Sequence, residues 1–279
     1  MTPAAVSAST AWPLPRLLRA SLGWHVAVLG TAVLVPDTAL WALGGIALNH
    51  GAIAAAGLLP RCHWLGTNLT RLPAEAAACG WVALTFDDGP DPAVTPRVLD
   101  LLDAAGQRAS FFCIADRVRA YPLLAREIVA RGHSIQNHTA RHRHDFAFLG
   151  PRAYAAEIAR AQAIVQDVTG TTPTCFRAPA GLRNPFLAPV LHRMGLALVS
   201  WTRRGFDTRS QPADAVLARL AGNRLAGGDI LLLHDGHAGR TPQGTPLVLD
   251  VLPRLLSALE ARQLRSVTLP QAMSVPIDA

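Results

Sequence analysis

The stretch Thr85-Phe86-Asp87-Asp88-Gly89-Pro90-Asp91-Pro92 decides the fold, because it stands where a buried strand ends and a turn begins. The apolar run Trp81-Val82-Ala83-Leu84 comes directly before it and is typical of such a strand. Gly-Pro then turns the chain away behind two adjacent carboxylates. Catalytic groups usually gather at this end of the strands in a β/α protein. Asp-Asp-Gly-Pro is also ordinary turn chemistry, so its meaning depends on the rest of the chain.

From Trp81 onward, apolar runs of strand length alternate with segments of helical periodicity. This alternation predicts a parallel β/α sheet with right-handed crossovers. About seven parallel strands in a chain of this length favour a distorted (β/α) barrel. An open doubly wound sheet is the alternative, but no Gly-x-Gly-x-x-Gly follows the first strand. The predicted strands are 81–86, 109–115, 133–137, 174–177, 196–201, 230–233 and 265–269, and the predicted helices are 95–105, 123–130, 153–168, 185–194, 213–225 and 247–263.

Two apolar runs, 17–35 and 38–59, precede the β/α pattern, and Pro36-Asp37 separates them. Each is near the ~20 residues that cross a bilayer. A cleaved secretory signal, a pair of core helices and a membrane hairpin are the competing interpretations. We favour the hairpin, because a signal peptide would not explain the second run.

The arginines beside the two apolar runs predict an orientation in the membrane. Arg16 and Arg19 precede the runs, while Arg61 and Arg71 follow them. By the positive-inside rule, both ends of the hairpin and the domain after it are cytoplasmic, at a bacterial-type inner membrane. The predicted organisation is a flexible N-terminus at 1–16, the hairpin at 17–59, a linker at 60–80, a domain at 81–270 and a tail at 271–279.

Composition removes several mechanisms. The chain lacks Lys, so all 26 basic residues are Arg, which excludes a Schiff-base lysine and a Walker lysine. The net charge of +7 suits an acidic polymer or a membrane surface. The arginines are not interleaved with aromatic residues, so we expect no nucleic-acid partner. The four cysteines lack metal-like or redox spacing, and we expect them to be reduced.

A pair of histidines closes the third predicted strand. His138 and His142 are four residues apart, and neutral imidazole suits Zn and other transition metals. The pair falls at the same edge as Asp87 and Asp88. One carboxylate with two histidines is a ligand set that leaves positions open for water and substrate.

Three more side chains with catalytic chemistry follow other strands. Arg177 ends the fourth predicted strand and could pair with one of the two carboxylates and hold it ionised. His234 follows three leucines and is a candidate general acid, and Asp207 could hydrogen-bond to it and raise its pKa. A structural salt bridge, a core histidine and a surface aspartate are the respective alternatives. Because five such motifs close five strands at one edge, coincidence would have to act at each independently.

These residues closely resemble the polysaccharide deacetylase family (carbohydrate esterase family four). The family's first motif, Thr-Phe-Asp-Asp-Gly-Pro, is complete at 85–90, and its second, His-Ser/Thr-x-x-His, stands at 138–142. The third stands as Arg-Ala-Pro-Ala-Gly at 177–181, and the fifth as Leu-Leu-His-Asp at 232–235. The resemblance covers residues 81–269, and the first two motifs together are highly specific.

The resemblance implies a divalent metal, above all Zn, with Co, Ni or Mn as alternatives. Asp87 would be the general base on metal-bound water and His234 the general acid for the leaving amine. Arg177 would orient Asp87, Asp207 would tune His234, and the backbone N–H of Ala180 would stabilise the oxyanion. The implied metal ligands are Asp88, His138 and His142, and the implied substrate-binding residues are Ala180, Gly181, Leu232 and Trp201.

Two positions depart from the family pattern. Ala180 and Thr208 stand where the third and fourth motifs usually carry aromatic residues that line the acyl and sugar site. Their loss predicts a more open site and an unusual acyl group or sugar.

The sequence as a whole predicts a membrane-tethered, metal-dependent hydrolase that removes an N-acyl group, an acetyl group first of all, from an amino sugar or glycan. A lipid-linked sugar is a further candidate substrate if the domain is cytoplasmic. The alternatives are a hydrolase of another non-peptide C–N bond, in a cyclic imide or ureide, and a catalytically silent sugar-binding membrane protein. Asp87 and His234 argue against the silent protein, since binding requires neither.

Overall fold

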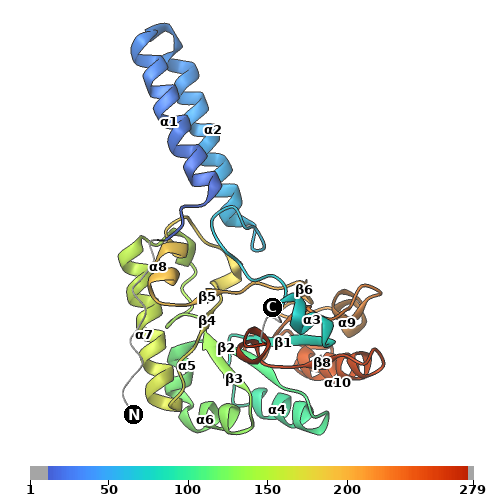
Figure 1. The fold of residues 1–279 in the computed structure, drawn as a ribbon. Coiled ribbons are helices and arrows are strands. Elements are labelled where there is room, and N and C mark those ends of the chain that lie inside the picture. The colour runs from blue at the N-terminus through green and yellow to red at the C-terminus, as the bar shows by residue number, and fades with distance from the viewer. Residues whose placement is uncertain (1–11, 276–279) are drawn as a thin grey trace.

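The computed structural model describes residues 12–275 and consists of a helical hairpin on a β/α domain (Figure 1). All strand pairs are parallel, in the order β5-β4-β3-β2-β1-β7-β6, with β8 paired to the start of β1. The strands at the two ends of this path, β5 and β6, do not pair with each other within the described residues, so the barrel is incomplete on that side. This confirms the predicted distorted (β/α) barrel. The strands are β1 (Trp81–Asp87), β2 (Ala109–Cys113), β3 (Ser134–Asn137), β4 (Cys175–Phe176), β5 (Ala197–Leu198), β6 (Arg203–Arg204), β7 (Ile230–His234) and β8 (Arg265–Ser266).

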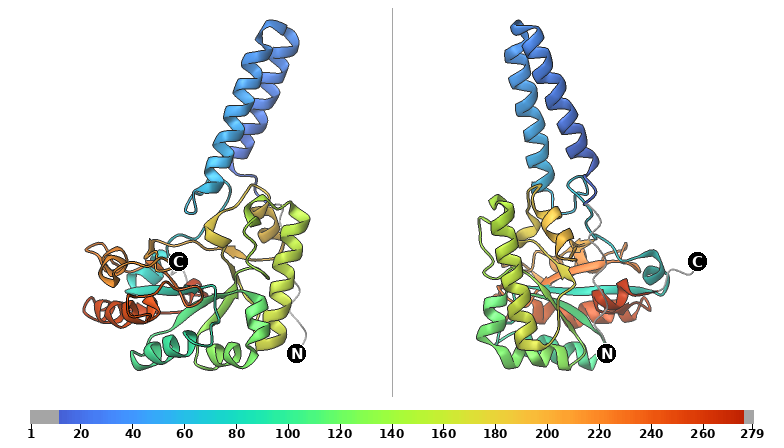
Figure 2. Two further views of the ribbon diagram at one scale, coloured as in Figure 1. Left: turned by 180° about the vertical axis from the view of Figure 1, so that it is seen from behind. Right: turned by 60° about the vertical axis from the view of Figure 1, so that its left-hand side comes forward.

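The central strand β1 is buried on both faces. Leu84 and Phe86 pack into the larger apolar cluster, while Ala83 packs into a second cluster on the opposite face. Helices cover the sheet from outside (Figure 2), and α10 shows why, because its apolar side chains recur at helical spacing and are buried against the sheet. The helices of the domain are α3 (Ala74–Ala78), α4 (Thr95–Ala104), α5 (Ala115–Ala120), α6 (Pro122–Ala130), α7 (Pro151–Thr169), α8 (Leu187–Arg193), α9 (Ala213–Ala221), α10 (Leu247–Glu260) and α11 (Leu269–Met273).

The structure adds elements that the sequence pattern did not predict. The strand β6 consists of Arg203 and Arg204 alone, which carry no apolar signal. The helix α5 begins at Ala115, where the second predicted strand was expected to end. Within 60–80, the predicted linker, Leu65 and Leu72 are buried and α3 forms, so this segment packs on the domain.

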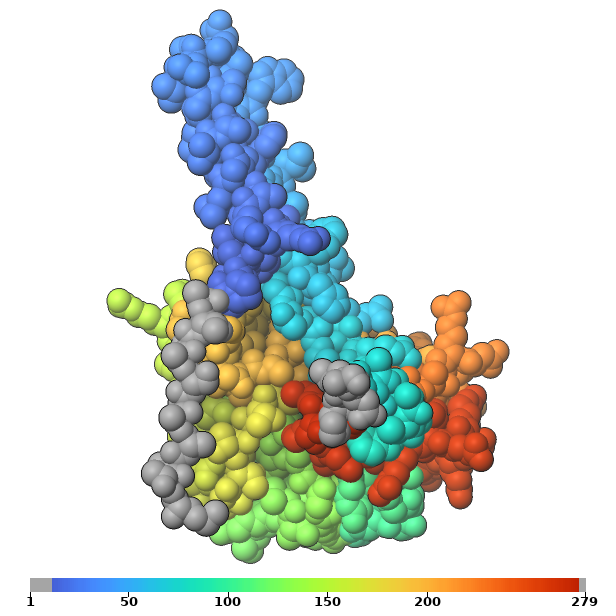
Figure 3. Space-filling view, in the orientation of Figure 1, coloured from blue at the N-terminus to red at the C-terminus, as the bar shows by residue number. Residues whose placement is uncertain are grey.

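The two N-terminal apolar runs form a hairpin that projects from the domain (Figures 1 and 3). It consists of α1 (Arg16–Leu34), a short turn of 3₁₀-helix η1 (Pro36–Thr38) and α2 (Ala39–Leu58). Two hydrogen bonds connect the helices. The Trp24 indole donates one to the Gly45 carbonyl oxygen at 3.2 Å, and the Asn49 side chain donates one to the Ser21 hydroxyl at 2.8 Å. Such contacts are typical of helix pairs in membranes.

Most of the hairpin's large apolar side chains are exposed. Trp41 is 84% exposed and Leu40 82%, and both helices are long and apolar enough to cross a bilayer. A pair of core helices would bury such side chains, so that interpretation is wrong. A membrane hairpin and a signal sequence remain.

Candidate active site

Strand register brings the predicted site residues together. Asp87 at the end of β1 is directly beside His234 at the end of β7, and Asn137 at the end of β3 is paired with Phe176 on β4. The residues that follow these strand ends, His138 and Arg177, are therefore neighbours too. A pocket of about 120 Å³ opens at these strand ends. It is lined by Asp87, Asp88, His138, His142, Ala180, Gly181, Trp201, Arg204, Thr208, Leu232 and His234.

Asp88, His138 and His142 form a group that could hold a metal ion, with one ligand atom of each within 4.8 Å of the others. The Nε2 atoms of His138 and His142 lie 3.3 and 3.2 Å from Oδ1 of Asp88. That oxygen is buried and accepts no hydrogen bond in the described part of the chain. A divalent cation between the three atoms would satisfy it, so the residues fit the ion implied by the sequence.

The protonation states of Asp88 and His142 also suit a cation. Burial would lower the pKa of His138, but Asp87 and Asp88 raise it above its ordinary value, so a bound cation would displace a proton from this imidazole. Burial would raise the pKa of Asp88, but the nearby imidazoles of His138, His142 and His234 hold it well below its usual range. Burial and the neighbouring His138 lower the pKa of His142 to about 4. At neutral pH the carboxylate is therefore ionised and this imidazole is neutral, as metal ligation requires.

A hydrogen bond fixes the tautomer of His138. Its Nδ1 lies 2.9 Å from the carbonyl oxygen of Arg177, and since a carbonyl only accepts, Nδ1 carries the proton. The lone pair on Nε2 is then directed at Asp88. This is the arrangement by which an outer hydrogen bond orients a metal-binding histidine.

The other carboxylate, Asp87, is held by Arg177. The Arg177 guanidinium donates to Oδ1 of Asp87 at 2.6 Å and to the Thr85 hydroxyl at 2.9 Å. It also donates to the carbonyl oxygen of Ser200 and lies 4.0 Å from the centre of the Phe112 ring. Arg177 is 1% exposed, so it positions Asp87 from behind while Oδ2 of Asp87 remains on the side of the pocket and of His138.

His234 is held by both oxygens of Asp207. Its Nδ1 donates to Oδ1 at 2.9 Å and its backbone N–H donates to Oδ2 at 2.8 Å. Burial alone would lower the pKa of His234, but the charge and hydrogen bond of Asp207, with the charges of Asp87 and Asp88, raise it above its ordinary value. The imidazole is therefore suited to carry a proton toward the pocket at neutral pH.

Several residues in the loops of the site have a left-handed backbone conformation, which residues other than glycine rarely adopt. The φ angles of Asp88, Thr139, His142 and Ala180 are 70°, 68°, 52° and 53°. Such left-handed residues cost about 1–3 kcal/mol each and cluster at functional sites. Gly236 explains part of the packing, because a Cβ there would lie 2.2 Å from the backbone oxygen of Asp88.

Three residues near the site were not assigned a role from the sequence. His237 lies with Nδ1 3.3 Å from Oδ2 of Asp88, and its spacing of three residues from His234 was the only available signal. Burial raises the pKa of Asp235 to about 7, and this carboxyl accepts a hydrogen bond from Thr95 at 2.6 Å. Arg204 lines the pocket from β6, a strand that carries no periodic signal.

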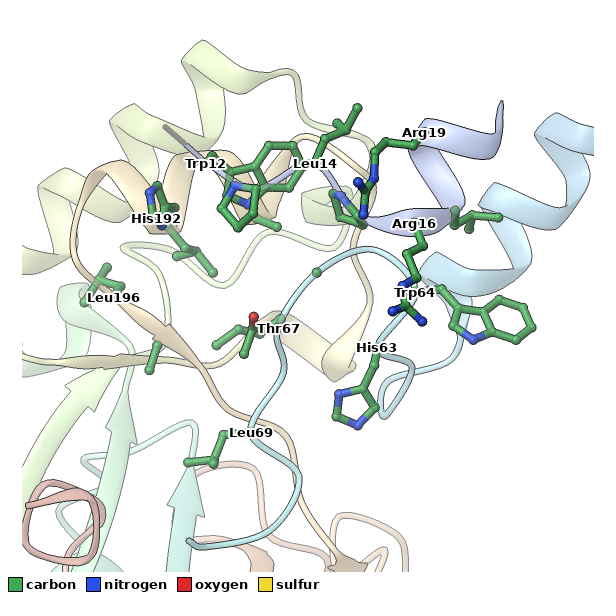
Figure 4. Close-up of a pocket in the computed structure, with 18 of the residues that line it drawn as sticks. Trp12, Leu14, Arg16, Arg19, His63, Trp64, Thr67, Leu69, His192 and Leu196 are labelled. Carbon is green, nitrogen blue, oxygen red and sulfur yellow. The ribbon is translucent and has the colours of Figure 1, made fainter. Parts of the chain in front are cut away.

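A much larger cavity, of about 680 Å³, lies elsewhere (Figure 4). It is formed where the hairpin meets α8 and β5, and its lining includes Trp12, Arg16, Trp64 and Leu196. None of the predicted catalytic or metal-binding residues lines it, so size alone does not locate the chemistry of this protein.

Comparison with known proteins gives a consistent result. The family model for polysaccharide deacetylase matches residues 75–199. A peptidoglycan-N-acetylglucosamine deacetylase of Bacillus cereus is 31% identical over 191 residues, which make up 68% of this chain and 66% of the relative. A chitooligosaccharide deacetylase of Sinorhizobium fredii is 34% identical over 210 residues, or 73% of this chain and 96% of the relative.

Solved structures agree with this similarity. A crystal structure of a peptidoglycan N-acetylglucosamine deacetylase has a TM-score of 0.67 at 27% identity and covers 76% of this chain and 95% of its own. A family 4 acetyl xylan esterase from Clostridium thermocellum, in complex with a cobalt ion, has a TM-score of 0.62 at 33% identity and covers 71% of this chain and 94% of its own.

Proposed function

We propose, from the premise that the chain belongs to the polysaccharide deacetylase family, that it is a metal-dependent hydrolase removing an N-acetyl group from an amino sugar or glycan. As a member of that family it is a hydrolase acting on carbon–nitrogen bonds other than peptide bonds. One observation carries the finer proposal: a carboxylate held by a buried arginine and an imidazole held by a buried aspartate line the same pocket as a ready-made set of metal ligands.

Asp88, His138 and His142 would hold the metal ion. When bound, a divalent ion supplies Lewis acidity toward an amide oxygen and makes water more acidic. Zn is our first candidate, because two imidazoles and one carboxylate suit it. Co, Ni and Mn remain alternatives for the same ligands.

The chain's own residues divide the proton transfers. Asp87 accepts a proton from the attacking water, and Arg177 fixes the direction of its free oxygen. His234 gives its proton to the nitrogen of the departing amine, which then leaves the acyl carbon as a neutral group. The reaction consumes one water and yields a carboxylate and an amine.

We propose that the acyl and sugar site is more open than the family's, because two of its aromatic residues are replaced. Ala180 and Thr208 line the pocket where aromatic residues were expected, while Trp201, Gly181 and Leu232 provide the rest of its wall. We propose that these residues contact the substrate and that the backbone N–H of Ala180 contributes to binding the oxyanion.

The membrane hairpin is part of the same proposal. Residues 17–59 would anchor the protein in a bacterial-type inner membrane with the catalytic domain on the cytoplasmic side, and glycans or lipid-linked sugars are both candidate substrates. Residues 60–80, 81–270 and 271–279 would be linker, catalytic domain and tail. The predicted flexible segment 1–16 lies mostly outside the described residues, as does the end of the tail.

The test is acetate release from N-acetylglucosamine oligomers by the purified full chain. We expect turnover that stops with a chelator and returns with Zn. Asp87→Asn should keep the metal, measured by atomic emission, and lose at least about a thousandfold in kcat, since it removes a general base. Chelator-resistant turnover would contradict the metal role.

The same purified protein, assayed with cyclic imides and ureides as well, separates the alternatives. If only cyclic imides or ureides were hydrolysed, the reaction would be a different C–N hydrolysis on the same scaffold. If metal and sugar bound but no product formed from any substrate, the protein would be a silent sugar-binding protein.

A further inference from the structure

The C-terminal end of α2 packs directly on the loop that carries Gly181. The backbone N–H of Arg183 donates to the carbonyl oxygen of Gly57 at 3.1 Å, and a Cβ at Gly57 would lie 2.1 Å from the Arg183 carbonyl oxygen. Pro60 covers the next turn, because a Cβ at Gly181 would lie 2.5 Å from the Pro60 Cβ and 2.8 Å from the Trp201 ring. Pro60, directly after the hairpin, therefore packs against Gly181 of the pocket wall.

Further hydrogen bonds hold this junction in place. The Ser200 hydroxyl donates to the Pro60 carbonyl oxygen at 2.7 Å, and the Arg61 guanidinium donates to the Thr202 carbonyl oxygen at 3.1 Å. The Arg183 guanidinium also donates to the carbonyl oxygen of Cys62. Hydrogen bonds thus connect the end of the hairpin to the segments on either side of Trp201 and after Gly181, two residues that line the pocket.

The hairpin is too short to hold the pocket away from a membrane. The helices α1 and α2 contain 19 and 20 residues, so each is about 28–30 Å long. The hydrocarbon core of a bilayer is ~30 Å thick. Once both helices are embedded, Gly57 and Pro60 lie at the level of the lipid headgroups, and the pocket wall that touches them lies there too.

Side chains at the base of the hairpin fit that level. Figure 4 shows Trp12, Arg16, Arg19 and Trp64 together where the helices meet the domain. Tryptophan is enriched at membrane interfaces, and arginine there attracts anionic headgroups. Arg16 and Arg19 form no ion pair with any carboxylate of the described residues.

Arg204 lines the pocket and forms no ion pair with a carboxylate of the described residues, although the charges of Asp87, Asp207 and Asp88 act on it from farther away. Its guanidinium carbon lies 5.2 Å from the Trp201 ring centre and 4.8 Å from that of Phe206. Its Nε is buried and has no hydrogen-bond partner among the described residues, and no carboxylate of these residues pairs with it. Arg203, beside it on β6, instead pairs with Asp229 at 2.7 Å. A partly buried guanidinium whose Nε has no hydrogen-bond partner is costly, and its planar fork matches the geometry of a phosphate or a carboxylate group.

From these contacts we infer the substrate class: an N-acetylated amino sugar joined through phosphate to a membrane lipid, with Arg204 binding the phosphate. The inference rests on the proposed deacetylase function and narrows its substrate. The lipid part stays in the bilayer around the hairpin, and the sugar reaches a pocket that the hairpin holds at the headgroup level.

The experiment uses the full chain, loaded with Zn, in lipid nanodiscs. Three substrates present the same N-acetylglucosamine unit: a polyprenyl diphosphate-linked sugar in the nanodisc, soluble UDP-N-acetylglucosamine, and neutral chitotetraose. We expect kcat/KM for the lipid-linked sugar to exceed that for each soluble substrate at least tenfold. Equal or better turnover of chitotetraose would overturn the inference while leaving the proposed function intact. Acetate from none of the three would contradict the proposed function as well.

Arg204→Gln tests the phosphate contact. The ratio of kcat/KM for each anionic substrate to kcat/KM for chitotetraose should fall about 10- to 100-fold, as expected from losing a charge-assisted hydrogen bond. The change should be mainly in KM. An unchanged ratio would remove Arg204 from phosphate binding and overturn the inference.

Gly57→Leu tests the junction, with Gly51→Leu as its matched control. A side chain at Gly57 collides with the Arg183 backbone, while a Cβ at Gly51, in the same helix, meets nothing within 4 Å. We expect Gly57→Leu to lower the ratio of lipid-linked to UDP-linked turnover at least fivefold and Gly51→Leu to leave it unchanged. The same ratio in both variants would show that the junction does not present the substrate.

Discussion

At the scale of single residues, the pocket contains two buried pairs that do opposite work. In one, the cation Arg177 stands behind the carboxylate Asp87; in the other, the carboxylate Asp207 stands behind His234. In the proposed reaction, the first pair presents a proton acceptor to the pocket and the second presents a proton donor. A carboxylate and an imidazole held in different surroundings within one pocket are typical of acid–base catalysis.

The substitution Asp207→Asn tests the second pair. Asp207 raises the pKa of His234 against the effect of burial, so without its charge the pKa of His234 should fall. As the pH rises, His234 would then lose its proton at a lower pH than in the unsubstituted protein. We expect the alkaline limb of the kcat/KM profile to move down by about one pH unit or more, measured with the metal content matched. If the limb stays in place while activity falls, Asp207 has only a structural role.

At the scale of elements, the active-site loops depend on close backbone contacts. Gly236, after β7, leaves no space for a side chain beside Asp88, whose own φ of 70° is strained. The position of Asp88, one of the proposed metal ligands, therefore depends on the absence of a Cβ at Gly236 in the loop after the neighbouring strand.

We expect Gly236→Ala to displace Asp88 and to weaken metal binding about 10- to 100-fold, as seen when groups that orient ligands are lost. Isothermal titration with Zn would measure the affinity. Gly150→Ala is the control, because its Cβ would meet nothing within 4 Å and its φ is −78°. Equal Zn affinity in the two variants would show that the Asp88 loop tolerates the added methyl group.

The elements also show how far the sequence alone could lead. The strands β1 and β7 were predictable because they are buried apolar runs, and the residues that close them carry the motifs. The strand β6 was not, since two arginines have no strand periodicity and are paired only because β7 lies beside them. Arg204 was missed for the same reason. His237 was missed because its contact with Asp88 depends on how two loops approach each other, which its spacing from His234 does not determine.

At the scale of the whole molecule, the exposed surface of the hairpin is apolar, unlike that of the β/α domain. The β/α domain buries most of its large apolar side chains, with exceptions such as Leu123 and Phe148, while the hairpin exposes Leu22, Val33, Leu40 and Trp41. Soluble monomeric proteins rarely expose a continuous apolar surface of this length to water. A bilayer would cover it, and the hydrogen bonds between α1 and α2 would stay inside.

We therefore expect the protein to remain in membranes after carbonate washing, with its N-terminus intact and a mass of 29.6 kDa. A signal sequence would instead be cleaved, and a shortened protein would be found outside the membrane fraction.

The exposed thiol of Cys79, just before β1, tests the predicted orientation. If the catalytic domain is cytoplasmic, a membrane-impermeant maleimide should label Cys79 only after the inner membrane is permeabilised. The variant Cys79→Ser should lose this labelling and so identify the reacting thiol. Labelling of Cys79 through an intact inner membrane would place the domain on the outer side, because both ends of a hairpin lie on the same side. The active site would then face cell-wall glycan, and the charge bias of Arg16, Arg19, Arg61 and Arg71 would be too weak to set the orientation.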